Sequence, residues 1–262
     1  VKIGYPDKWK DYTNLVINDS LSLYENLANI KEYFWIDDLD RKVGKPVDKT
    51  EWLMSPQTIN AYYNPTTNEI CFPAGILQPP FFDPESDDAI NYGAIGAVIG
   101  HEMTHGFDDQ GCQFDKTGNQ RNWWTEADKT TYDKRTKVLE DYFSNIEVVN
   151  GKKINGKQTL GENIGDNGGL NVALRAMHNA GTAAAEIDGL KADQRFFLGW
   201  ARIWASNNRP EYMDMLLTND VHSPNIARVN GALPHIDEWY TAFGIKKSDK
   251  LYIPKNKRAH IW

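Results

Sequence analysis

Two histidines one helical turn apart are the residues of this chain whose chemistry is easiest to infer. Residues 101–105 read His-Glu-Met-Thr-His. On a helix, positions i and i+4 lie on the same side, so the imidazoles of His101 and His105 can reach one metal ion. This spacing is typical of hydrolytic zinc sites, in which three protein ligands leave one coordination position for water. It therefore predicts a zinc site on this segment.

A second acidic motif offers the remaining ligand. Farther along the chain, residues 162–166 read Glu-Asn-Ile-Gly-Asp. Glu162 supplies a carboxylate as the third ligand, and Asp166, one helical turn later, can accept a hydrogen bond from a ligand histidine. The alternative for Asp166 is an ordinary acid on a helix surface. Together the two motifs predict one Zn²⁺ per chain.

The composition around the first motif indicates that its helix is buried. Residues 93–100 are apolar and small, with glycines that lower helix propensity and suggest close packing against another segment. A buried histidine or glutamate must be paired or metal-bound. Because Glu102 is not needed as a ligand, it is placed to act as general base, taking a proton from a zinc-bound water. The alternative is a charged, solvated helix face.

Two further segments are ambiguous from spacing alone. Asp220 precedes His222 by two residues and can orient its ring or raise its pKa, which would make His222 a donor to a developing oxyanion. A histidine near a loop is also often a plain surface residue. Arg228 can bind a substrate carbonyl or carboxylate, or it can belong to a structural ion pair.

Length, composition and charge restrict the class of protein. The chain has 262 residues and a formal net charge of −7, so clustered phosphate contacts are not expected and nucleic acid is excluded as a partner. The sequence contains no run of 18 apolar residues, so a membrane span is not expected within this stretch. The two cysteines, Cys71 and Cys112, do not form a disulfide framework, which fits a reducing cytosol better than a secreted chain.

Periodicity predicts an α+β fold that is mainly helical with a small antiparallel sheet. A helix is expected to begin at a cap near Asp19 and Ser20, and residues 58–73 read as a β-hairpin with a polar turn. Further helices are expected over about 91–107, 125–145, 161–180 and 193–207. Trp200 and Trp204 share one face of the last of these, and a stripe of this kind is usually core.

Five segments in order resemble the neprilysin family of metalloendopeptidases. They are residues 60–63 (Asn-Ala-Tyr-Tyr), 72–82, 101–111 (the extended zinc motif), 161–169 and 220–224 (Asp-Val-His-Ser-Pro). The resemblance implies a thermolysin-like zincin (gluzincin) catalytic domain acting on oligopeptides on the amino side of apolar residues.

The same resemblance implies a role for individual residues. It assigns zinc to His101, His105 and Glu162, with Glu102 as base and Asp166 holding His101. His222, with Asp220 behind it, would stabilise the transition state, and Arg228 would bind a substrate carbonyl oxygen. Asn60 and Ala61 would bind the peptide backbone at a sheet edge. The pocket for the apolar residue would be lined by Ile76, Phe81, Val98, Ile203 and Trp204, for which plain core packing is the alternative.

Domain organisation follows from the length of the family's members. They are far longer, and an N-terminal half supplies most of a helical domain that caps the cleft. We therefore predict that residues 1–52 lead into the capping domain and that residues 53–262 form the catalytic domain. A zinc-binding but inactive fragment is the alternative to an active endopeptidase.

A location can be inferred in the same way. The cysteines of vertebrate ectoenzyme members are not matched, which indicates a bacterial oligopeptidase-type member in the cytoplasm. A secreted or membrane-anchored protein is the alternative, if an N-terminal segment has been removed.

Overall fold

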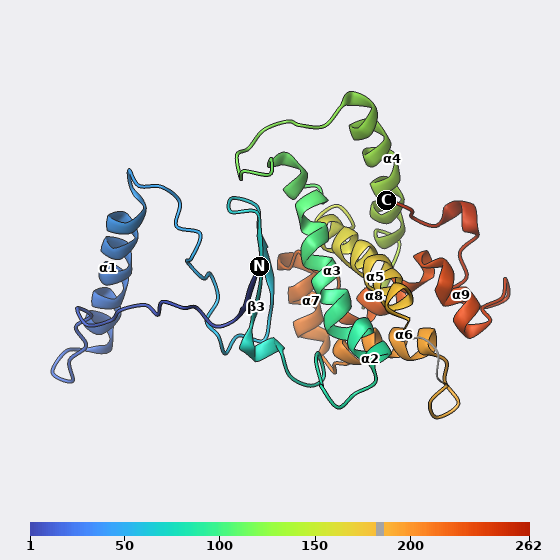
Figure 1. Cartoon of the computed structure of the whole chain (residues 1–262), viewed down its shortest axis with the longest axis horizontal. Helices are drawn as coiled ribbons and strands as arrows, with labels where there is room; N and C mark the ends of the chain where they lie inside the picture. Colours follow the sequence, from blue (N-terminus) through green and yellow to red (C-terminus); the bar gives the residue numbers. More distant parts are fainter. Residues whose placement is uncertain (182–185) are drawn as a thin grey trace.

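Most of the helices gather around the one that carries His101 and His105 (Figure 1). The computed structural model describes residues 1–181 and 186–262. The described helices are α1 (Leu23–Lys42), α2 (Asp88–Asn91), α3 (Ala97–Thr104), α4 (Glu126–Phe143), α5 (Leu160–Ala180), α6 (Ala192–Ile203), α7 (Pro210–Asn219), α8 (Asn225–Asn230) and α9 (Asp237–Phe243). The described strands are β1 (Lys2–Gly4), β2 (Tyr62–Asn64), β3 (Glu69–Pro73), β4 (Glu147–Val149) and β5 (Lys152–Lys153). The predicted fold class, mainly helical α+β, is confirmed.

The predicted hairpin forms one side of a small sheet. Strands β2 and β3 pair antiparallel, with Tyr62 opposite Cys71, and β1 adds in parallel on the far side of β3. The parallel strand was not predicted, because three residues are too few to show alternation. The strand order β1-β3-β2 leaves β2 as an edge strand, and the residues just before it face the metal centre described below.

The helix that carries the two histidines is longer than α3 alone. A π-helical turn (Tyr92–Gly96) joins α2 to α3, and a 3₁₀ turn (His105–Phe107) follows. A Cβ added to Gly93 would lie 1.9 Å from the carbonyl oxygen of Phe196 on α6. The small residues before His101 therefore let the backbones approach closely, as the composition predicted.

Helix α5 crosses α3 with the opposite chain direction. Near its start, Gly161 faces Asp109, which follows α3, and later Gly169 lies against Gly100 within α3. Between these points, a Cβ on Gly165 would come within 2.7 Å of the His101 ring. Glycines on α5 thus bring its carboxylates within reach of the histidines on α3.

A hydrophobic core packs against the crossing of α3 and α5. Trp200, Phe196 and Phe197 of α6 are almost completely buried, and they share a cluster with Leu170 and Met177 of α5. The prediction that Trp200 is core is confirmed, although α6 ends at Ile203 rather than near residue 207. The α4 prediction is also confirmed, since the Thr125 side chain accepts a hydrogen bond from the Asp128 backbone.

Helix α1 stands apart from this core (Figure 1). It starts after Ser22 rather than at the predicted cap, because Ser22 and Glu25 form a reciprocal capping box. None of its residues is buried, and Tyr24 and Trp35 are 81% and 67% exposed. Among the described residues, no helix has the length and apolar character needed to cross a bilayer.

Candidate metal centre and cleft

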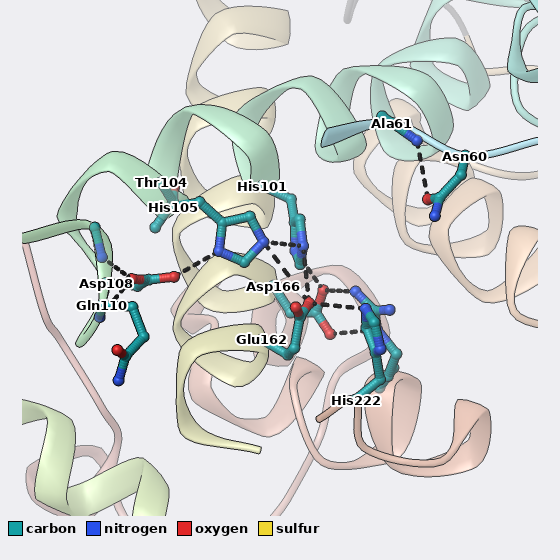
Figure 2. Close-up of polar contacts among 12 residues, drawn as sticks. Asn60, Ala61, His101, Thr104, His105, Asp108, Gln110, Glu162, Asp166 and His222 are labelled. Carbon is teal, nitrogen blue, oxygen red and sulfur yellow. Dashed lines mark hydrogen bonds and ion pairs between the residues drawn. The ribbon is translucent and has the colours of Figure 1, made fainter. Parts of the chain in front are cut away.

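His101 of α3, His105 directly after α3 and Glu162 of α5 converge on one point (Figure 2). One ligand atom from each of His101, His105 and Glu162 lies within 4.8 Å of the others. The Nε2 atoms of the two histidines are 2.9 Å apart, and Glu162 Oε2 is 3.2 Å from His101 Nε2 and 3.7 Å from His105 Nε2. The structure thus brings together the three residues that the sequence proposed as ligands.

Hydrogen bonds on the far side of each ring fix which nitrogen faces this point. His101 Nδ1 lies 2.9 Å from Asp166 Oδ1, and His105 Nδ1 lies 2.6 Å from Asp108 Oδ2. A carboxylate can only accept, so each Nδ1 carries a hydrogen, and each ring presents an Nε2 lone pair when it is neutral. With both rings neutral, three electron-pair donors face one another, an arrangement that a cation between them stabilises.

The electrostatics agree with a site built for positive charge. Burial opposes protonation of His101, but its hydrogen bonds to Asp166 and Glu162 outweigh burial and raise its pKa to about 10. Burial also opposes ionisation of Glu162, but the neighbouring His101 keeps the pKa of this carboxyl well below its usual range. Glu162 Oε2 is buried, and the polar atoms nearest to it are the Nε2 atoms of His101 and His222, each at 3.2 Å. The donor set, two imidazoles and a carboxylate, suits zinc.

Asp166 also binds the buried Arg228. The guanidinium donates from Nε to Asp166 Oδ2 at 2.8 Å and from Nη2 to Asp166 Oδ1 at 2.6 Å, and it stacks on the Trp204 ring at 3.8 Å. Burial opposes ionisation of Asp166, but Arg228 and His101 hold its pKa below the usual range. Arg228 thus forms the structural ion pair that the sequence analysis gave as one alternative, and it also lines the cleft; its contact with a substrate stays a prediction.

Glu102 lies on the cleft wall beside the metal-binding residues. It is 6% exposed, and burial raises the pKa of its carboxyl, while the nearby His101 and His105 partly offset the rise. A carboxyl with a raised pKa can both accept and return a proton near neutral pH.

His222 approaches the same centre from the loop after α7. Its Nδ1 lies 2.7 Å from Asp220 Oδ1, and its Nε2 lies 3.2 Å from Glu162 Oε2. Because Asp220 engages Nδ1, Nε2 can donate only when the ring is an imidazolium.

A cleft of about 900 Å³ runs past these residues. Ile76, Phe81, Val98 and Trp204 line its apolar end, as predicted. Ile203 does not line it, which departs from the prediction, because Ile203 precedes Trp204 by one position and is directed into the core. Trp200 lines the cleft instead, one helical turn before Trp204.

The edge of the sheet forms another wall of the cleft. Asn60 and Ala61 line it directly before the edge strand β2 (Figure 2). The Ala61 backbone N–H already donates to the Asn60 side-chain oxygen at 2.9 Å. The placement fits the predicted contact with a peptide backbone, but this donor must first be released from Asn60.

Asp108 is the main site residue that the sequence analysis did not single out. Besides holding His105, its Oδ1 accepts from the backbone N–H groups of Gln110 and Gly111 at 2.8 and 2.6 Å. Its position three residues after His105, at the spacing of side chains that meet on a helix, was a signal that could have identified it.

Comparisons with known proteins place this geometry in context. Residues 60–259 match the model of peptidase family M13. The chain is 40% identical to a neutral endopeptidase of Lactobacillus helveticus and 42% identical to endothelin-converting enzyme 1 of Homo sapiens, over 100% and 99% of its length. It spans only 39% and 35% of those proteins. Zinc metalloprotease Zmp1 of Mycobacterium tuberculosis, solved with an inhibitor, superposes with a TM-score of 0.95 at 46% identity, covering 100% of this chain and 41% of that one.

The two carboxylates behind the histidines can be tested by metal binding. We expect Asp108→Asn and Asp166→Asn each to weaken zinc binding by roughly 10–100-fold, because a neutral amide makes the facing imidazole a poorer ligand. Competition with a chelating dye measures the affinity. Asp141→Asn on the exposed face of α4 is the matched control and should bind zinc like the unchanged chain. Equal affinity in all three variants would contradict the role of Asp108 and Asp166.

Proposed function

The chain belongs to peptidase family M13, and from this premise we propose that it is the catalytic part of a zinc endopeptidase that hydrolyses oligopeptides. The observation that carries the proposal is the convergence of His101 Nε2, His105 Nε2 and Glu162 Oε2 in a cleft that also contains Glu102. When bound there, Zn²⁺ would polarise a water molecule and lower its pKa.

Glu102 is the general base in this proposal. Its buried carboxylate removes a proton from the attacking water and returns it to the leaving amine, and the raised pKa suits both transfers. It shares α3 with His101, so the helix fixes its position relative to the ligands.

His222 and Arg228 act on the oxygen of the reacting carbonyl and on the peptide beside it. The ring of His222 is held by Asp220, and its Nε2, when protonated, donates to the negative charge that develops on this oxygen. Arg228 uses two N–H groups on Asp166, and its remaining N–H groups are available to a peptide carbonyl.

The cleft also suggests how a peptide lies in it. An extended peptide can run along the edge next to β2, where Asn60 and Ala61 present polar backbone groups. Its apolar side chain, that of the residue after the cleaved bond, then enters the end lined by Val98, Phe81 and Ile76. An inactive, merely zinc-binding fragment is the less favoured reading, because both Glu102 and His222 are retained beside the centre.

We further propose that residues outside this chain cover α1. The relatives are more than twice as long, and Leu23, Tyr24 and Trp35 expose between 67% and 81% of their surface. Apolar groups exposed to this extent on one helix are usually buried by a partner. We propose that the partner of α1 is the N-terminal half of the full-length protein, which would also form a cap over the cleft.

Replacing the base should separate metal binding from catalysis. Glu102→Gln should retain zinc and lower the rate of peptide hydrolysis by about 10²–10⁴-fold, because the amide cannot accept the proton. Zinc content and cleavage of a fluorogenic peptide are measured on the same samples. Met103→Gln, an exposed change on the same helix, serves as the control. Substantial residual cleavage by the Glu102 variant would remove Glu102 from this role.

The apolar end of the cleft should set a preference for the residue after the cut. In a library of peptides that differ at this position, Phe and Leu should be cleaved best and Asp and Lys worst. Loss of one methylene contact in such a pocket changes kcat/KM by about 10–200-fold. Mass spectrometry of the products identifies the cut, and a preference for charged residues there would overturn the assignment of this pocket.

Coverage of α1 can be measured by hydrogen exchange. Amides of residues 23–42 should exchange quickly in this chain alone and slow markedly when the chain is produced together with the N-terminal half of the full gene product. Amides of the exposed face of α4 provide the internal comparison and should not change. Equal exchange of α1 with and without the added half would refute this partner.

A further inference from the structure

The two ends of the cleft differ in chemistry, and the polar end carries an unpaired cation. The apolar end lies beside Val98, one turn before His101 on α3, whereas Asp108 and Gln110 follow the same helix at the other end. Because α5 runs in the opposite direction to α3, the loop that precedes α5 lies at the Asp108 end. Lys157 belongs to this loop, is exposed and lines the cleft.

Hydrogen bonds hold the backbone of this loop in place. The Thr159 N–H donates to the Asn155 carbonyl at 3.1 Å, and the Gln158 N–H donates to the Asn155 side-chain oxygen at 3.2 Å. The Gln158 side chain donates to the Asp220 carbonyl at 2.8 Å, which links the loop to the segment that carries His222. A Cβ on Gly156 would lie 2.2 Å from the Glu140 carbonyl oxygen, so the loop packs directly on α4. The anchor point of the Lys157 side chain is therefore fixed.

Several other charged groups that line the cleft are bound to neighbouring residues. Arg228 is bound to Asp166, Asp108 is bound to His105 and two backbone N–H groups, and Glu162 faces the histidines. Asp109 also lines this cleft, and its Oδ2 accepts a hydrogen bond from the Gln110 side chain at 2.9 Å. Within residues 1–181 and 186–262, Lys157 makes no hydrogen bond or ion pair. Its ammonium is thus available to a ligand.

We propose that Lys157 is a specificity-determining residue that favours peptides with a carboxylate side chain on the amino side of the cleaved bond. The inference rests on the proposed function, because the apolar residue after the cut must occupy the Val98 end for the preceding residues to extend toward Lys157. An extended peptide advances about 3.3 Å per residue, so the cation meets a residue within a few positions of the cut. An exposed ion pair at such a rim contributes a modest but measurable preference.

The test uses peptides that contain a single Phe and otherwise uncharged residues. Glu, Gln or Lys is then placed in turn at each of the positions that precede the Phe. With the unchanged chain, Glu at one of these positions should raise kcat/KM about two- to fivefold over Gln, and Lys should lower it by a similar factor. Lys157→Glu should reverse this order, so that the Glu-to-Lys ratio changes by about tenfold or more. The preference should shrink when the salt concentration rises from about 0.02 M to about 0.5 M.

Lys153→Glu is the matched control, since Lys153 is exposed on β5, carries the same charge and does not line the cleft. Lys153→Glu should leave both the Glu-to-Lys ratio and the cleavage of the Gln peptides unchanged. An equal shift with Lys153→Glu would show a general effect of net charge and overturn the proposal, as would an unchanged ratio with Lys157→Glu.

Equilibrium binding separates this inference from the proposed function. Fluorescence anisotropy of the same labelled peptides on the zinc-loaded Glu102→Gln chain measures dissociation constants without turnover. If no peptide is cleaved by the unchanged chain, the endopeptidase proposal fails, yet a Lys157-dependent difference in binding between Glu and Lys peptides would still support the specificity role. If peptides are cleaved but neither binding nor rate differs in this way, the specificity role of Lys157 is refuted and the endopeptidase proposal stands.

Discussion

The structure depends on one electrostatic requirement, which is that three electron-pair donors facing one another need positive charge between them. Asp166 and Asp108 fix the tautomers of His101 and His105, so that both Nε2 lone pairs are directed toward Glu162. With both rings neutral the arrangement is repulsive without a cation, and with a metal ion it is a set of three ligands. The carboxylates behind the rings are therefore as necessary to the site as the ligands themselves.

The crossing of α3 and α5 brings these groups together, and glycine makes the crossing close enough. Gly100 and Gly169 meet backbone to backbone, and Gly165 leaves room for the His101 ring. Each glycine within a helix lowers its intrinsic stability by roughly 0.5–1 kcal/mol relative to alanine. The buried aromatic residues of α6, together with Leu170 and Met177, supply the packing that offsets this loss. The geometry of the candidate metal site thus depends on residues with no side chain, supported by large buried side chains in the core.

Features encoded by local spacing could be predicted from the sequence, and features that depend on tertiary contacts could not. The turn between His101 and His105 and the turn between Glu162 and Asp166 place side chains on one helix face whatever surrounds them. The hairpin was visible through its polar turn. By contrast, the parallel pairing of β1, the ion pair between Arg228 and Asp166, and the exchange of Ile203 for Trp200 in the cleft wall arise from segments that meet only after folding.

The hydrogen bond between the Ala61 N–H and the Asn60 side chain affects how the cleft selects what it binds. A peptide that pairs with this N–H replaces one hydrogen bond with another of similar strength, so the exchange adds little net affinity. The satisfied donor also makes this sheet edge less attractive to stray strands, a hazard of open edges. Under the proposed function, discrimination between peptides would therefore come mainly from their side chains, and backbone pairing at this edge would contribute little to it.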